Sequence, residues 1–352
     1  MKQRLISIAM VCCTSPAVFA ENGNITFYGK FDADVETVKN SKPLGTNVAS
    51  KKQFVSNGSR FGIKGTEELG ADLQGIYQLE AQVDLSGTGG NGFGNGTRNS
   101  HVGIKGDWGT AFLGVWDTPL KTVRSKLDVF DKSNSSTATG LIGNKDQTSA
   151  NNFSLRPKNT VQYWPPPVAG IQGKLAYALD GAPTTTTDKT LWSISAAYDQ
   201  NGVYGGLGHE VHNDYNYSGS SDKATRLLGR YDIGASWLGF EYERLSYSSN
   251  TGADISRNAW SASALYKFGD SSVSGYYTKA GDVSGTSDTG AHQAALRYGY
   301  AFSKRTELYG MYSAISNKSA SMYSLGSTAL GTTVQGAGAK LSVVGVGISH
   351  TF

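Results

Sequence analysis

Hydrophobic and polar residues alternate along most of this chain, with the period of a β-strand. In residues 25–35, Phe27 and Val35 fall on one face, while Lys30 and Asp34 fall on the other. Successive side chains of a strand point to opposite faces, so this segment has one apolar face and one charged face. The same division recurs in three further segments, at residues 60–64, 74–83 and 297–302.

Continued along the chain, this pattern predicts sixteen strands. They lie near residues 25–36, 54–67, 72–84, 97–106, 109–116, 156–164, 171–180, 190–199, 202–212, 224–233, 236–246, 257–268, 272–280, 290–303, 306–316 and 340–352. Short turns and long polar loops alternate between them, which is the layout of an outer-membrane barrel. We therefore expect an all-β fold: a transmembrane antiparallel β-barrel of 16 strands, with short periplasmic turns and long extracellular loops.

The lengths of these strands fit a membrane. A strand of about ten residues, rising about 3.3 Å per residue and tilted by about 45°, crosses an apolar band of about 25 Å. An even number of strands allows the sheet to close, and closure is required because each unpaired backbone group in lipid costs several kcal/mol. After the first twenty residues no run of eighteen apolar residues occurs, so no transmembrane helix is expected.

The N-terminal segment differs from the rest of the chain. Residues 1–20 have a basic start, an apolar centre at residues 5–13 and small residues up to Ala20, which predicts a secretory signal peptide cleaved before Glu21. A buried apolar helix is the structural alternative. Both cysteines lie in this segment, so residues 21–352, the expected single barrel domain, contain no thiol. Removal of the signal peptide lowers the formal net charge from +4 to +2. A net charge this small does not indicate a protein that binds nucleic acid.

The segment at residues 117–155 is too long for an ordinary connection. It contains Asp128 and Asp131, and then turns into serine, threonine, glycine and asparagine. We expect this third loop to fold into the lumen and narrow it. Four basic residues lie in the same segment and would make the narrowed region more uniformly positive if they point into it: Lys121, Arg124, Lys126 and Lys132.

The last strand ends on Phe352, on the same face as Val344, Val346 and Ile348. A terminal aromatic residue on an apolar face is typical of the girdle at a membrane boundary. It also matches the C-terminal signature by which barrel proteins are recognised for insertion into the outer membrane.

Several short motifs, in the same order over the whole chain after the signal, resemble the general porins of Gram-negative bacteria. The similarity is to the trimeric, sixteen-stranded porins of β-proteobacteria. The motifs lie at residues 27–30 (FYGK), 59–70 (SRFGIKGTEELG), 98–104 (RNSHVGI), 108–114 (WGTAFLG), 300–309 (YAFSKRTELY) and 347–352 (GISHTF). The sequence departs from the family pattern at Val115-Trp116-Asp117, where Arg-Gln-Tyr is commoner, and at Trp164-Pro165-Pro166-Pro167.

The resemblance implies a constriction in which wall arginines face acidic residues of the third loop. By position the wall residues are Arg60, Arg98 and Arg156, with Lys30 as a fourth positive group. The facing acids are Asp128 and then Asp131. The alternation puts Lys30 and Arg60 on the polar face of their strands.

Arg98 is a special case among these residues. It shares its parity with Val102 and Ile104, so it reaches the lumen only if a bulge intervenes or if that wall faces protein. Three or four cations against about two acids predict a transverse field and weak anion selectivity, since rings of Arg or Lys favour anions. The plainer alternative is a solvated polar lumen face with no special geometry.

The resemblance also implies a homotrimer in the outer membrane of a Gram-negative bacterium. The implied partners are membrane lipid and lipopolysaccharide, the barrel-assembly machinery during biogenesis, and small hydrophilic solutes and ions that diffuse passively. Two other functions remain open, a channel specific for sugars or organic acids and an adhesin that binds through loops near residues 213–223 and 317–339.

We expect neither enzymatic activity nor a cofactor. The sequence has no Gly-x-Ser-x-Gly motif of a serine hydrolase. His209 and His212 are three residues apart, so they would lie on opposite faces of a strand and would not share a metal ion.

Overall fold

The computed structural model describes residues 24–45, 49–87, 93–130, 137, 140–144, 152–181, 183–184, 187–325 and 335–352. The predicted signal peptide and Asp131 lie outside the described residues. The strands are β1 (Asn24–Asn40), β2 (Ser50–Ser56), β3 (Arg60–Gly70), β4 (Leu73–Val83), β5 (Phe93–Thr97), β6 (Ser100–Gly106), β7 (Gly109–Val115), β8 (Thr160–Trp164), β9 (Ile171–Ala178), β10 (Thr190–Gln200), β11 (Val203–Asn213), β12 (Ser221–Ile233), β13 (Ser236–Tyr247), β14 (Ile255–Phe268), β15 (Ser271–Ala280), β16 (Ala291–Ala301), β17 (Thr306–Asn317) and β18 (Lys340–Thr351). Between β7 and β8 lie the helix α1 (Pro119–Val123) and the 3₁₀ helix η1 (Arg124–Leu127).

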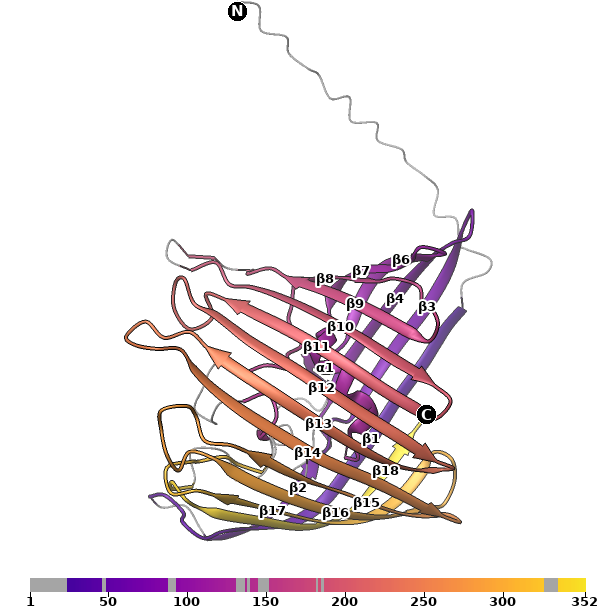
Figure 1. Ribbon diagram of the computed structural model, residues 1–352. Helices are drawn as coiled ribbons and strands as arrows, with labels where there is room; N and C mark the ends of the chain where they lie inside the picture. Colours follow the sequence, from indigo (N-terminus) through magenta and orange to yellow (C-terminus); the bar gives the residue numbers. More distant parts are fainter. Residues whose placement is uncertain are drawn as a thin grey trace, which may run out of the picture.

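Neighbouring strands pair antiparallel in chain order, and β18 pairs with β1, so the sheet closes into a barrel (Figure 1). Within the described residues, β2 and β3 pair with the same edge of β1, and β5 and β6 pair with the same edge of β4. Each of these two pairs counts as one interrupted strand of the barrel. The eighteen segments therefore form sixteen barrel strands, which confirms the prediction.

Each of the two interruptions inserts one residue into the sheet. On β4, Gln78 and Ala81 are three positions apart, but their partners on the neighbouring segments, His101 and Thr97, are four positions apart. An extra residue of this kind is a β-bulge, and it exchanges the faces of the side chains before and after it. This is the bulge that Arg98 requires, and it turns the arginine inward although Val102 points outward.

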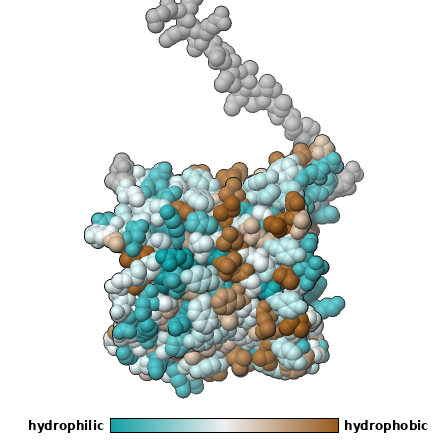
Figure 2. Space-filling view, viewed as in Figure 1, coloured by the Kyte–Doolittle hydropathy of each residue, from teal (hydrophilic) through white to brown (hydrophobic). Residues whose placement is uncertain are grey.

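The predicted alternation is present on both surfaces of the barrel. On β1, Val35 is 61% exposed and Asp34 is 2% exposed, because the apolar face points outward and the charged face points inward. Figure 2 shows hydrophobic side chains on the outer surface of the viewed face. An apolar outer face is what a lipid environment requires.

Short turns join many of the strands at one end of the barrel. Between β10 and β11, Asn201 and Gly202 both have positive φ, 55° and 75°. Two successive left-handed residues form the type I′ turn, whose twist matches that of paired strands. Asparagine and glycine are the residues that adopt this conformation most readily, so the sequence determines the tight connection.

The closing seam joins the first and last strands. The backbones of Gly29 and Phe352 exchange two hydrogen bonds of 3.1 Å. The Phe352 ring lies 5.2 Å from Phe31, centroid to centroid, and a Cβ on Gly29 would lie 2.3 Å from it. The terminal aromatic ring therefore occupies the space that a side chain at position 29 would need.

The described part of the loop between β7 and β8 lies inside the barrel, as predicted, with α1 against β9, β10 and β11 (Figure 1). The helix was not expected from the sequence, although Thr118-Pro119 is a helix-start signal: the Thr118 side chain accepts a hydrogen bond from the Lys121 amide, and Pro119 fills the first turn. No helix among the described residues is long and apolar enough to cross a membrane.

Part of the loop that follows β17 also turns inward. Tyr323 and Leu325, both 0% exposed, belong to one buried cluster with Phe130, Leu141 and Ile142 of the third loop. The cluster continues onto wall residues of β17 and β18. Apolar packing between the two loops and the wall thus fills part of the interior.

The lipid-facing surface gives a first prediction. Val346 on β18 is 60% exposed. Replacing it with arginine puts a charge in the apolar band, so we expect Val346→Arg to lower the free energy of unfolding by about 2–4 kcal/mol. Urea titration in lipid vesicles measures this, with Val346→Leu as the control at the same position. Equal stability of the two variants would contradict the outward orientation.

Candidate functional site

A cavity of about 780 Å³ lies inside the barrel between the third loop and the wall. Among the described residues, five basic and three acidic side chains line it: Arg60, Arg98, Lys121, Arg124 and Arg156, with Glu80, Asp117 and Asp128. The three arginines that the sequence assigned to the wall therefore lie around one space, together with Asp128. The charges form three groups.

The first group surrounds Glu80 on β4. Its Oε1 atom lies 2.6 Å from Arg98 Nε, and its Oε2 atom lies 3.7 Å from Arg60 Nε. Tyr28 donates a hydrogen bond of 3.1 Å to the same carboxylate. Two guanidinium groups thus share one carboxylate, so this part of the wall carries a net positive charge.

The second group surrounds Asp117, at the start of the third loop. Its Oδ1 atom lies 2.6 Å from Lys121 Nζ and 3.1 Å from Arg156 Nε. Asn99 orients the group, since it donates to Asp117 and accepts a bond of 2.7 Å from Arg156 Nε. Burial lowers the pKa of Lys121, and the attraction of Asp117 opposes that shift. Here too, two cations share one acid.

The third group lies on the loop side and has the opposite balance. Arg124 Nε lies 2.8 Å from both carboxylate oxygens of Glu241, and Arg124 Nη1 lies 3.5 Å from Asp128 Oδ2. Two acids surround one guanidinium, so this group is net negative. Charge is therefore distributed unevenly around the cavity, with a positive excess near Glu80 and Asp117 and a negative excess near Arg124, where Glu241 of β13 lies behind the lining. Such an uneven distribution produces a field across the cavity.

The other predicted residues are placed differently. Lys30 is on the inner face but does not line this cavity, and its Nζ atom lies 2.8 Å from Asp32. Lys126 does not line the cavity either and pairs with Asp199 at 2.9 Å. Asp131 is outside the described residues, so its assignment to the constriction stays a prediction.

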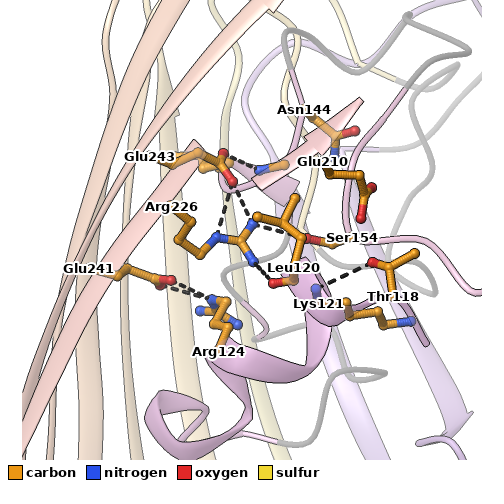
Figure 3. Close-up of polar contacts among 12 residues, drawn as sticks. Thr118, Leu120, Lys121, Arg124, Asn144, Ser154, Glu210, Arg226, Glu241 and Glu243 are labelled. Atoms are coloured by element: carbon orange, nitrogen blue, oxygen red, sulfur yellow. Dashed lines mark hydrogen bonds and ion pairs between the residues drawn. The ribbon is translucent and has the colours of Figure 1, made fainter. Parts of the chain in front are cut away.

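Buried side chains of the wall hold the third loop in place (Figure 3). Arg226 on β12, 0% exposed, donates a bond of 2.8 Å to the Leu120 carbonyl and one of 2.9 Å to Ser154 Oγ. It also pairs with Glu243 on β13, whose other oxygen accepts a bond of 2.6 Å from the Gly143 amide. The wall thus binds the loop at both of its ends.

A second buried arginine connects the third loop to the loop after β17. Arg257 on β14 donates a bond of 2.6 Å to the Leu141 carbonyl and one of 2.9 Å to the Tyr323 hydroxyl. The first bond gives a partner to a backbone carbonyl inside the barrel, and the second connects the arginine to a side chain of the other loop. The loop position is therefore fixed by polar contacts as well as by apolar packing.

A family model for Gram-negative porins matches residues 7–320. This chain belongs to that family. It is accordingly an outer-membrane channel of a Gram-negative bacterium, through which small hydrophilic solutes diffuse passively, and the family consists of channels and not of enzymes.

Individual relatives agree with this assignment. The chain is 28% identical to outer membrane porin protein 32 of Delftia acidovorans, over 100% of both chains. It is 25% identical to major outer membrane protein P.IB of Neisseria gonorrhoeae, over 87% of this chain and 91% of that one. The structure resembles an anion-selective porin from Comamonas acidovorans, with a TM-score of 0.82 and 26% identity over 94% of this chain and 100% of that one.

Sequence reasoning about this porin missed the acid partners of its arginines. The alternation in residues 74–83 places Glu80 on the polar face of its strand, but nothing in the sequence identifies its partner. The register supplies it, because Gly62 of β3 lies opposite Glu80 and so brings Arg60 near it. Asp117 stands where the family pattern differs, and that departure was the available signal.

Among the described residues of this porin, no group of three His, Cys, Asp or Glu side chains is arranged so that it could hold a metal ion. His209 Nδ1 lies 2.8 Å from Thr225 Oγ1, and its ring contacts the exposed Trp192. His212 is 0% exposed and stacks on Phe153 of the third loop. The prediction that the two histidines lie on opposite faces is confirmed.

The contacts of Arg226 give a second prediction. Arg226→Met leaves the Glu243 carboxylate buried without its main partner, which costs about 3–5 kcal/mol in the free energy of unfolding. The loop also loses two bonds, so we expect a noisier open-channel current. Arg244→Met, on the exposed side of β13 with bonds of only 3.4 Å, is the matched control. Equal effects of the two substitutions would contradict a clamp at Arg226.

Proposed function

We propose that this porin conducts small hydrophilic solutes and ions with a weak preference for anions, and that the constriction is the cavity between the third loop and the wall. Arg60, Arg98 and Arg156 supply the positive wall, and Asp128 and Asp131 belong to the loop side. The observation that carries the proposal is the sharing of Glu80 and of Asp117 by two cations each.

The charge balance explains why the preference is weak. The described lining residues carry two more basic than acidic groups, and Glu241 offsets one of the basic groups from behind. An anion therefore meets a small net attraction at the wall, and a cation meets the acids at the loop. The similarity to the anion-selective porin of Comamonas acidovorans supports the same sign.

We further propose that the chain works as a homotrimer of three separate pores, surrounded by outer-membrane lipid and lipopolysaccharide. A structure of OmpT from Vibrio cholerae, which shares the fold at a TM-score of 0.67, is described as a trimer form. Cleavage of a signal peptide after Ala20 and recognition of Phe352 by the barrel-assembly machinery complete the proposed route to the membrane.

The selectivity follows from the wall arginines, which gives the third prediction. In Arg98→Ser/Arg156→Ser, Glu80 and Asp117 each keep one cation, so the positive wall becomes neutral. A unit charge about 8 Å away in water contributes about 0.5 kcal/mol, so we expect the anion-to-cation permeability ratio to fall about twofold or more for each charge removed. The reversal potential of planar-bilayer channels in a KCl gradient measures this ratio.

Lys126→Ser is the control, since it removes a charge of the same loop that does not line the cavity. It leaves the reversal potential unchanged. Cation preference of the native channel, or equal shifts in the double variant and the control, would overturn the proposal.

The oligomeric state gives the fourth prediction. A homotrimer of separate pores, purified in detergent and inserted into a planar bilayer, closes in three equal steps at high voltage. A single closing step, together with a monomeric mass in native mass spectrometry, would exclude the trimer while leaving the channel itself intact.

A further inference from the structure

Four aromatic rings gather on the barrel wall beside the constriction. His101 on β6, Phe112 on β7, Trp116 after β7 and Trp164 at the end of β8 form this cluster, here called the aromatic patch. The Phe112 centroid lies 4.9 Å from that of His101, 5.3 Å from that of Trp116 and 5.0 Å from that of Trp164. The two tryptophans, 6.0 Å apart, are edge to face.

The aromatic patch faces the lumen. Leu113, Val161 and Tyr163 alternate with its members along β7 and β8 and are the residues exposed on the outer surface. Phe112 is 3% exposed and forms the base of the patch, while Trp116 and Trp164 remain partly exposed. Two indole rings thus present part of their surface to the water-filled channel.

Two glycines lie on the wall among these rings. A Cβ on Gly103 would lie 2.5 Å from the Phe112 Cβ. A Cβ on Gly114 would lie 2.1 Å from the Ser100 carbonyl oxygen, and the φ of 155° at Gly114 is one that other residues rarely adopt. At both positions a side chain would collide with the neighbouring strand, so the wall carries none there.

The aromatic patch is continuous with the charged constriction. Trp116 directly precedes Asp117, which pairs with Arg156. Trp164 Nε1 donates a bond of 3.1 Å to Gln162, and Gln162 donates one of 3.1 Å to the Asp117 carbonyl. On the other side, Lys174 Nζ lies 4.4 Å from the centre of the Trp164 ring. Cations therefore flank the patch at both ends.

If these rings served only to pack the barrel wall, they would be completely buried. Otherwise polar side chains would stand in their place, as on most of the lumen face. Partly exposed indole rings between two cations instead have the composition of a site for an amphipathic anion. Aromatic side chains bind flat rings by stacking, and cations bind a carboxylate by charge-assisted hydrogen bonds. A sugar would need hydrogen-bonding groups around the rings but no cations.

We propose that the aromatic patch is a binding site, on the permeation path, for organic anions that carry an aromatic ring. The ring stacks on Trp116 and Trp164, and the carboxylate pairs with Lys174, which lies against the Trp164 ring, whereas Arg156 already pairs with Asp117. The inference rests on the proposed anion-preferring channel and adds the class of solute that this channel retains for longest. The sequence places both tryptophans at departures from the general porin pattern.

The test uses the full-length porin in planar bilayers, with benzoate as the probe in constant KCl. We expect saturable block of the single-channel current by benzoate, with half-block at a concentration about tenfold lower than for acetate, which lacks the ring, or benzyl alcohol, which lacks the charge. In Trp116→Leu/Trp164→Leu, the half-block concentration for benzoate rises about tenfold, and the reversal potential in a KCl gradient stays unchanged.

Trp192→Leu, which alters a tryptophan on the outer surface, is the matched control and keeps the native block. Lys174→Gln retains all four rings, so it removes the cation without the loss of packing that the leucine substitutions cause. It raises the half-block concentration for benzoate severalfold. Block by maltose at the same concentrations as benzoate would overturn the inference in favour of a sugar site. Unchanged benzoate block in the double leucine variant or in Lys174→Gln would also overturn it.

These results separate the two proposals. A native channel that prefers anions but shows equal block by benzoate and acetate contradicts the aromatic site alone. A native channel that prefers cations contradicts the proposed function itself.

Discussion

The structure depends on one requirement: every backbone amide and carbonyl that crosses a membrane needs a hydrogen-bond partner within the protein. A closed sheet meets it, because β18 returns to β1 and leaves no edge. Closure in turn fixes which side chains face lipid and which face the lumen, since the two kinds alternate along each strand of the barrel. The acids of β1 are therefore inside for the same reason that Phe27 and Val35 are outside.

The interior must then solve a second problem, which is to hold a long loop in the lumen without leaving its backbone unpaired. Arg226 and Arg257 do this by donating to the carbonyls of Leu120 and Leu141. Arginine suits this role because its guanidinium keeps its charge and offers five donors. Apolar packing against Tyr323 and Leu325 adds to these polar contacts.

The sequence was sufficient for features that repeat locally. The alternation of hydrophobic and polar residues located the sixteen barrel strands, and the unusual length of one connection identified the loop that folds inward. Arg98 shows the limit, because its direction depends on one inserted residue that no local pattern reveals. The pairing of Glu80 with Arg98, and that of Arg226 with the Leu120 carbonyl 106 residues away, depend on register and loop placement and so appear only in three dimensions. The helix at Thr118-Pro119 is different, since its start signal was present and local.

The seam between Gly29 and Phe352 has a consequence for the order of folding. It joins the first and last strands of the barrel, which are far apart in the sequence, so the entropic cost of closing the ring is not offset by contacts until β18 reaches β1. Until then β1 and β17 both keep an open edge, which is the arrangement most exposed to aberrant pairing. The Phe352 ring, seated in the space left by Gly29, thus completes the barrel only when all other strands are in register, and a chain that lacks its final strand would remain an unclosed sheet.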